Sequence, residues 1–131
     1  MKIVNVGIMN FEAFRQRTLA IAKGEYKPKK NEPKIWFNSI KVFAEVLCTE
    51  NLELLSLIDT IKPATIKELV QHTGRKASNL SRTLHNLERY NIVSLEKIKT
   101  TVRPVAKATR FHLDIDVSNF MDSHSKHIAV A

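Results

Sequence analysis

The chain has 131 residues, which suffices for one domain with a hydrophobic core. Its formal charge of +8 favours a polyanionic partner over a basic one. Its single cysteine, Cys48, excludes an internal disulfide and a multi-cysteine zinc site, as is typical of a reducing cytoplasm. Because there is no apolar run long enough to span a membrane and no secretory leader, we expect a cytoplasmic protein without membrane contact.

The first 34 residues predict a strand-helix extension followed by a linker. Residues 2–8 (KIVNVGI) are β-branched and apolar, which favours a short strand. Asn10 is a suitable N-cap for a helix that Gly24 ends. Residues 24–34 contain two prolines and four lysines without apolar periodicity. This basic linker is either a solvated connector or an arm that contacts phosphates.

The next segment predicts a short buried strand at the aromatic cluster 35–37, then three helices. The first begins after Asn38 or Ser39 and breaks at Thr49-Glu50. The second covers residues 51–61, where the approach of Pro63 ends it. The third is short: Thr65 and Glu68 form a capping box at its start, and Gly74 permits a sharp turn at its end.

Residues 75–90 predict a longer, basic helix with two distinct faces. Leu80, Leu84 and Leu87 recur at helical spacing and form one apolar stripe. The opposite face carries guanidinium and amide groups, which pair with base edges in a major groove. The alternative is an ordinary amphipathic helix with a solvated face. If the helix binds DNA, we expect the contacts from this segment to come from Arg75, Lys76, Ser78, Asn79, Ser81, Arg82, His85, Asn86 and Arg89.

After Asn91 the alternation predicts two strands, at residues 92–97 and 109–117. Pro104 argues against a continuous strand between them, so residues 98–108 are expected to form a basic loop. Two strands directly after a basic helix would make a wing. The alternative is a basic hairpin without a partner. On the wing, the residues expected at the phosphate backbone or minor groove are Lys97, Lys99, Arg103 and Lys107.

The segment from Glu68 to Lys97 resembles MarR/ArsR-type winged helix-turn-helix regulators, in which a Leu-Ser-Arg-x-Leu-x-x-Leu-Glu run leads into the wing. Here that run is Leu80 to Glu88. The likeness covers roughly residues 3–117, and is closest to predicted prokaryotic regulators that include DNA-binding antitoxins. It implies an α+β fold with a winged helix-turn-helix domain at 35–117 and a C-terminal tail at 118–131. Asn91 stands where glycine is usual, and asparagine tolerates the same left-handed backbone.

Two functions follow from the residues and the resemblance. The first is a sequence-specific DNA-binding transcriptional regulator, a repressor that acts as a homodimer through its N-terminal strand and helix. The alternative is an antitoxin that binds and neutralises a toxin protein and regulates its own operon. No nucleophile motif or phosphate loop is present, so we expect neither an enzyme nor a cofactor. Paired Asp114 and Asp116, and a weak metal set of Asp122, His124 and His127, are the only catalytic or metal candidates, and we expect no site at either.

Overall fold

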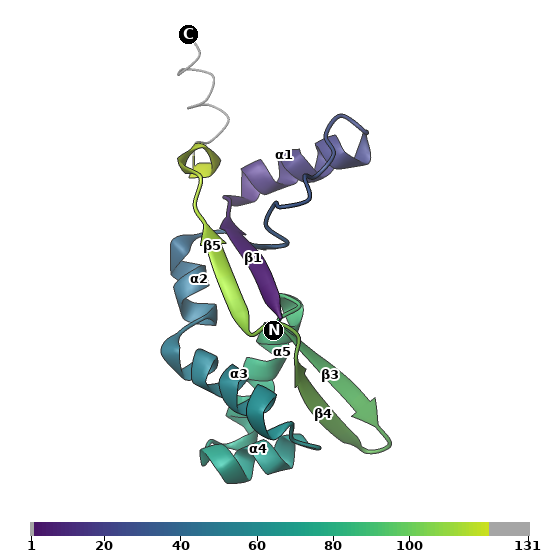
Figure 1. Cartoon of the computed structure of the whole chain (residues 1–131), viewed down its shortest axis with the longest axis vertical. Helices are drawn as coiled ribbons and strands as arrows, with labels where there is room; N and C mark the ends of the chain where they lie inside the picture. The colour runs from purple at the N-terminus through teal and green to yellow at the C-terminus, as the bar shows by residue number, and fades with distance from the viewer. Residues whose placement is uncertain (1, 121–131) are drawn as a thin grey trace. The chain divides into compact units, whose positions relative to one another are not determined.

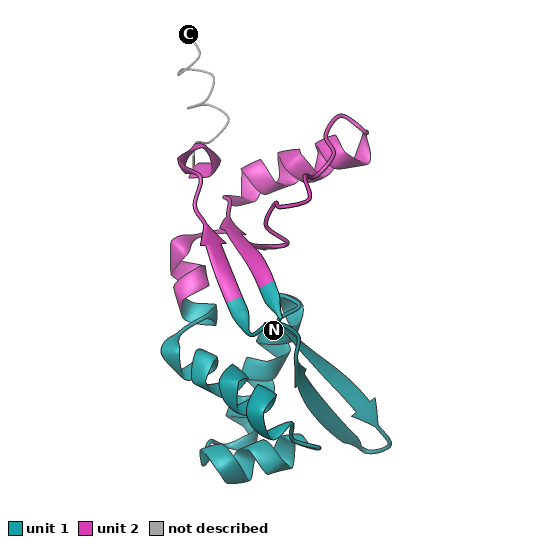
Figure 2. Cartoon of the chain, in the orientation of Figure 1, with its two compact units in different colours: residues 1–3, 45–110 teal, residues 4–44, 111–131 magenta. Residues whose placement is uncertain are grey.

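The computed structural model describes residues 2–120 and has an α+β fold (Figure 1). The chain forms two compact units, one of residues 1–3 and 45–110, the other of residues 4–44 and 111–131 (Figure 2). The predicted boundaries at 34/35 and 117/118 stay predictions. Most of the predicted tail, with Asp122, His124 and His127, lies outside the described residues. Within the described part, no helix combines the length and apolar character needed to cross a membrane.

The unit of residues 4–44 and 111–131 contains a three-stranded sheet in the order β2-β1-β5. Strand β1 covers Ile3–Ile8 and pairs in parallel with β2, Ile35–Phe37, so that Gly7 lies opposite Trp36. Strand β5 covers Arg110–Asp114, and a short 3-10 helix follows at Val117–Phe120. The strands predicted at residues 2–8 and 35–37 are therefore confirmed.

Helix α1, Phe11–Ala22, connects β1 to the linker before β2. It begins as predicted, because the Asn10 side-chain oxygen accepts a hydrogen bond from the Ala13 backbone N–H at 2.7 Å. Helix α2, Ile40–Val46, starts at Ser39, whose hydroxyl accepts from the Val42 backbone N–H at 3.1 Å. Of the two predicted caps, Ser39 is thus the one that caps α2.

The unit of residues 1–3 and 45–110 contains α3 (Thr49–Ile61), α4 (Ile66–Thr73), α5 (Ala77–Arg89) and a hairpin of β3 (Val93–Ile98) and β4 (Thr101–Ala106). The break predicted at Thr49-Glu50 lies slightly earlier, because α3 already begins at Thr49 with Cys48 as its N-cap. Apolar side chains from each element form the core: Leu54, Leu55, Ile58, Leu69, Leu80, Leu84, Leu87, Val93 and Ala106.

The predicted pairing of the wing strands was wrong. Strand β3 pairs with β4, Thr101–Ala106, and not with residues 109–117. Most of that second predicted strand forms β5 in the three-stranded sheet. The prediction was wrong because it took Pro104 as evidence against a strand. The β3–β4 sheet has only two strands, so one edge of β4 is unpaired, and a proline that lacks an N–H at this edge removes no hydrogen bond between the strands. Residues 98–108 are consequently not a long loop.

Candidate nucleic-acid interface

Capping hydrogen bonds hold both ends of α4, the helix that precedes the turn to α5. At its start, the Thr65 hydroxyl accepts from the Glu68 backbone N–H at 3.2 Å. The Glu68 carboxylate accepts in return from the Ala64 backbone N–H at 2.6 Å, one residue earlier than in the usual capping box. These two bonds satisfy N–H groups that a helix start leaves unpaired. The capping box predicted from Thr65 and Glu68 is therefore present with this small change.

At the end of α4, Gly74 has a φ of 71° and its N–H donates to Val70 O at 2.9 Å. This left-handed cap is the conformation that glycine adopts without steric cost. The following Arg75 donates from its backbone to the Thr73 hydroxyl at 3.2 Å and from its guanidinium to Glu50 O at 3.1 Å. Arg75 thus links the turn to the first turn of α3.

Helix α5 has one buried and one exposed face, as its sequence predicts. Leu80, Leu84 and Leu87 are each fully buried. Around the opposite face, Ser78, Asn79, Arg82, His85 and Arg89 are exposed, while Ser81 and Asn86 at its margins are half-buried. A packed apolar stripe holds the helix in place, so its polar face has a fixed orientation. The structure therefore brings the predicted α5 residues together on one surface.

The start of α5 has no side-chain cap and no acidic residue in its first turn. Lys76 occupies the N-cap with extended backbone angles, φ −64° and ψ 141°. The positive end of the helix dipole thus meets another positive charge, although a side-chain acceptor or an acid is the usual choice there. Such a helix start favours an anion supplied from outside the chain.

The cations of α5 are available to a ligand. Within the described residues, the side chains of Lys76, Arg82 and Arg89 have no hydrogen bond or ion pair, and neither has Asn79. His85 differs, because its Nδ1 lies 2.7 Å from Ser81 O. A carbonyl oxygen only accepts, so Nδ1 is the donor in this contact. The face therefore offers guanidinium donors, an amide that both donates and accepts, and an imidazole ring.

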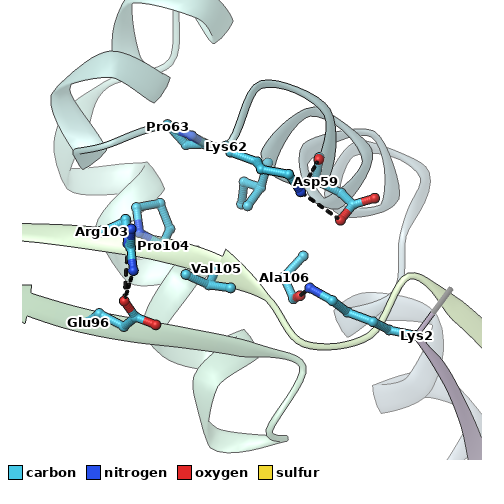
Figure 3. A pocket seen from close by; sticks show the side chains of 10 residues that line it. Lys2, Asp59, Lys62, Pro63, Glu96, Arg103, Pro104, Val105 and Ala106 are labelled. Atoms are coloured by element: carbon cyan, nitrogen blue, oxygen red, sulfur yellow. Dashed lines mark hydrogen bonds and ion pairs between the residues drawn. The ribbon is translucent and has the colours of Figure 1, made fainter.

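The hairpin carries the remaining predicted residues on different parts of its surface. Glu96 lies opposite Arg103 in the register, and the Arg103 Nε donates to the Glu96 carboxylate at 3.1 Å, with Nη2 closer still (Figure 3). This cross-strand ion pair neutralises Arg103 locally. Beyond the last pair, Ile98 and Thr101, the turn residue Lys99 has a φ of 56°. Lys97 and Lys99 are both exposed.

Lys107 follows β4 and has a partner. Its Nζ donates to the Asn91 side-chain oxygen at 2.7 Å. Asn91 itself has a φ of 62°, which confirms the left-handed backbone predicted for this turn. Of the four predicted hairpin cations, Lys97 and Lys99 lie toward the tip without a partner in the described residues, whereas Arg103 and Lys107 are engaged nearer the base.

A small cavity of about 210 Å³ lies between the end of α3 and the base of the hairpin (Figure 3). Its wall includes Ile58, Pro63 and Pro104, and charged groups surround it. Those charges already have partners: Lys62 lies 3.9 Å from Asp59 and Lys2 donates to Ala106 O at 2.5 Å. Across residues 2–120, no three side chains of the metal-ligating types cluster closely enough to hold an ion. The exposed surface of α5 and the hairpin tip is thus the stronger candidate site.

The sequence did not predict the side-chain partners of two expected DNA-binding residues: Glu96 binds Arg103, and Asn91 binds Lys107. For Asn91, the sequence indicates a backbone role alone. Glu96 is seven positions from Arg103, a spacing that becomes a contact only when a tight hairpin brings the two strands together. The short polar turn Lys99-Thr100 between two β-branched runs could have predicted this hairpin. Pro104 in the second run argued against a strand there and so hid the pattern.

A protein-family model described as HVO_A0114 matches residues 46–113, more than half of the chain. The match begins at the end of α2 and ends within β5, so it includes α3, α4, α5 and the whole hairpin. Comparison with curated proteins and with solved structures found no match in either set.

Proposed function

The chain belongs to the HVO_A0114 family, and we propose that it is a sequence-specific DNA-binding transcriptional regulator with a winged helix-turn-helix domain. In this proposal α4 and α5 are the helix-turn-helix, α5 enters the major groove, and the β3–β4 hairpin is the wing. The observation that carries the proposal is the free face of α5. There the side chains of Asn79, Arg82 and Arg89 are exposed and have no partner among the described residues, while the leucines behind them are fully buried.

The chemistry of that face supports base recognition as well as phosphate binding. Arginine pairs bidentately with guanine, and asparagine pairs bidentately with adenine. Both residue types lie on a rigid helix, which holds them in the fixed geometry that such pairs require. A face evolved only for solubility would be expected to mix acids with its bases, yet Glu88 is the sole acid in α5 and lies away from the face centre.

The turn and the hairpin support contacts to the DNA backbone. The uncapped start of α5 and the neighbouring Lys76 favour a phosphate. At the hairpin tip, Lys97 and Lys99 offer only charge, which binds phosphates without distinguishing sequences. We therefore assign sequence discrimination to Asn79 and Arg82, and general affinity to Lys76, Lys97 and Lys99.

We propose that the protein acts as a homodimer, because helix-turn-helix proteins commonly bind two half-sites about 34 Å apart. Of the predicted interface, the N-terminal strand and helix, we keep helix α1, because Val6 and Ile8 of the strand are fully buried within the chain. None of its twelve residues is buried, and its Phe11 and Phe14 side chains are 72% and 38% exposed. Aromatic residues on an uncovered helix are typical of interfaces. Repression by blocking a promoter would follow from dimeric binding at an operator.

The test compares binding to a selected duplex with binding to random duplex DNA. A preferred sequence is first obtained by selection from a randomised duplex pool with the full chain. Arg82→Ala and Asn79→Ala should then each weaken binding to that sequence by about 1–3 kcal/mol and weaken binding to random DNA far less. Lys99→Ala should weaken both by a similar factor.

The matched control is Lys67→Ala, an exposed lysine on α4, whose effect on sequence preference should be negligible. If selection yields no preferred sequence, or if Arg82→Ala weakens binding to both duplexes equally, α5 is at most a phosphate-binding helix and the proposal is wrong.

Sedimentation of Phe11→Ser beside the parent chain tests the dimer: the parent should be dimeric at micromolar concentration and the variant should dissociate more readily.

A further inference from the structure

A second strongly basic surface lies in the unit that does not contain α5. The loop between α1 and β2 includes five lysines, all exposed: Lys23, Lys27, Lys29, Lys30 and Lys34. No side chain of these lysines forms a hydrogen bond or an ion pair with any described residue. Like charges close together along a chain repel one another, so an ordinary solvated connector would be free to spread them apart.

This loop is attached at several points. Near its start, the backbone N–H groups of Glu25 and Tyr26 donate to Ala20 O at 2.9 and 3.2 Å. Near its end, Lys34 N donates to Asn5 O at 2.9 Å, and the Asn5 side chain donates to Asn31 O at 3.1 Å. Both ends are therefore bonded to α1 or β1, although the loop has no regular secondary structure.

Arg17 of α1 forms the main attachment in the middle. Its Nη2 lies 2.8 Å from the Glu32 carboxylate, and only 17% and 19% of the two side chains are exposed. Its guanidinium also lies over the rings of Trp36 and Tyr26, at 5.2 and 5.8 Å from their centroids. The Trp36 ring in turn lies against Gly7, where a Cβ atom would come within 2.7 Å of Trp36 Cε3.

The ion pair reduces the negative charge that can offset the lysines. The loop contains two acids, Glu25 and Glu32, and the Glu32 carboxylate already binds Arg17. The groove beside this cluster is lined by further acids, Asp114 and Asp116, together with Lys29. That groove is unfavourable for a phosphate. Of the five lysines only Lys29 lines that groove, and Lys23, Lys27, Lys30 and Lys34 lie outside it.

We infer that the loop of residues 23–34 is a second nucleic-acid contact, which binds the phosphate backbone of duplex DNA without regard to sequence. A loop already held in one arrangement loses little conformational entropy when it binds, so its charges contribute more than those of a flexible arm. Each phosphate it neutralises releases counterions, which makes the contribution dependent on salt. The inference rests on the proposed function only in its choice of DNA as the polyanion.

The test measures the salt dependence of binding to a random-sequence DNA duplex. For the variant Lys27→Gln/Lys30→Gln/Lys34→Gln in the full chain, the slope of log K against log salt should fall by about 0.9 for each phosphate that the protein no longer neutralises, up to about 2.7. Lys41→Gln, an exposed lysine on α2 in the same unit, is the control and should leave the slope unchanged.

The attachment of the loop by Arg17 is tested by proteolysis. Arg17→Lys keeps the charge but removes the guanidinium that binds Glu32, and should speed trypsin cleavage after Lys29 and Lys30.

The outcomes separate this inference from the proposed function. A slope equal to that of the parent chain in the triple variant overturns the inference, whatever α5 does. A loss of heparin binding with an unchanged DNA slope also overturns it, because the partner would then be another polyanion. A reduced slope in a protein that shows no sequence preference supports this inference while refuting the proposed role of α5.

Discussion

The Lys107 ammonium donates a hydrogen bond to the Asn91 side-chain oxygen at 2.7 Å, and so connects the residue after β4 to the turn after α5. The Lys107 backbone N–H also donates to Ile92 O at 2.8 Å. These bonds close the base of the hairpin against the end of α5. The orientation of the hairpin relative to α5 therefore depends on this turn.

Asn91 should be replaceable by glycine more easily than by alanine. Its φ of 62° lies in the left-handed region, where alanine loses about 1–2 kcal/mol and glycine loses nothing sterically. Asn91→Gly removes only the side-chain bond to Lys107. In urea denaturation, Asn91→Ala should therefore reduce the free energy of unfolding clearly more than Asn91→Gly. Equal losses would show that the side-chain bond, and not the backbone, decides the choice of residue.

Gly74 and Gly7 should fail to accept alanine for different reasons. A Cβ at Gly74 meets nothing within 4 Å, so Gly74→Ala should cost only the backbone penalty of about 1–2 kcal/mol. A Cβ at Gly7 would lie 2.8 Å from Pro33 Cγ and closer to Trp36, so Gly7→Ala must displace the ring. Because Trp36 is the sole tryptophan, its fluorescence should change in Gly7→Ala and stay the same in Gly74→Ala. A shifted spectrum in both variants would contradict this separation.

Local patterns predicted the helices well, and long-range pairing explains what they missed. The caps at Asn10, Thr65 and Gly74 and the leucine spacing in α5 act within a few residues, so the sequence reveals them directly. Strand partners lie far apart in the chain. Residues 110–114 alternate like a strand of the hairpin, but their place beside β1 depends on a tertiary contact that periodicity does not encode. The attachment of the lysine loop by Arg17 and Glu32 was invisible for the same reason.

The cross-strand ion pair should make Arg103 a weaker DNA contact than the sequence alone suggested. Because Glu96 already binds the Arg103 guanidinium, Arg103→Ala should change the salt slope on random duplex DNA less than Lys99→Ala does. Glu96→Gln should increase affinity for any duplex, since it removes a carboxylate and frees the guanidinium. Fluorescence anisotropy at several salt concentrations measures both effects. Equal slope changes for Arg103→Ala and Lys99→Ala would mean that DNA displaces Glu96.

Lys99→Asn should change stability and DNA binding in opposite directions. Lys99 has a φ of 56° at the hairpin turn, a conformation that asparagine tolerates better than lysine, so the free energy of unfolding should rise by a few tenths of a kcal/mol up to about 1 kcal/mol. The same change removes an exposed charge from the proposed wing, so the salt slope on duplex DNA should fall by about 0.9. Thr100→Asn, at the neighbouring turn position without positive φ, is the control and should produce neither effect. Because the variant is expected to be more stable than the parent chain, weaker binding could not be explained by unfolding. A variant that is more stable and binds DNA with an unchanged slope would show that the hairpin tip does not contact phosphate.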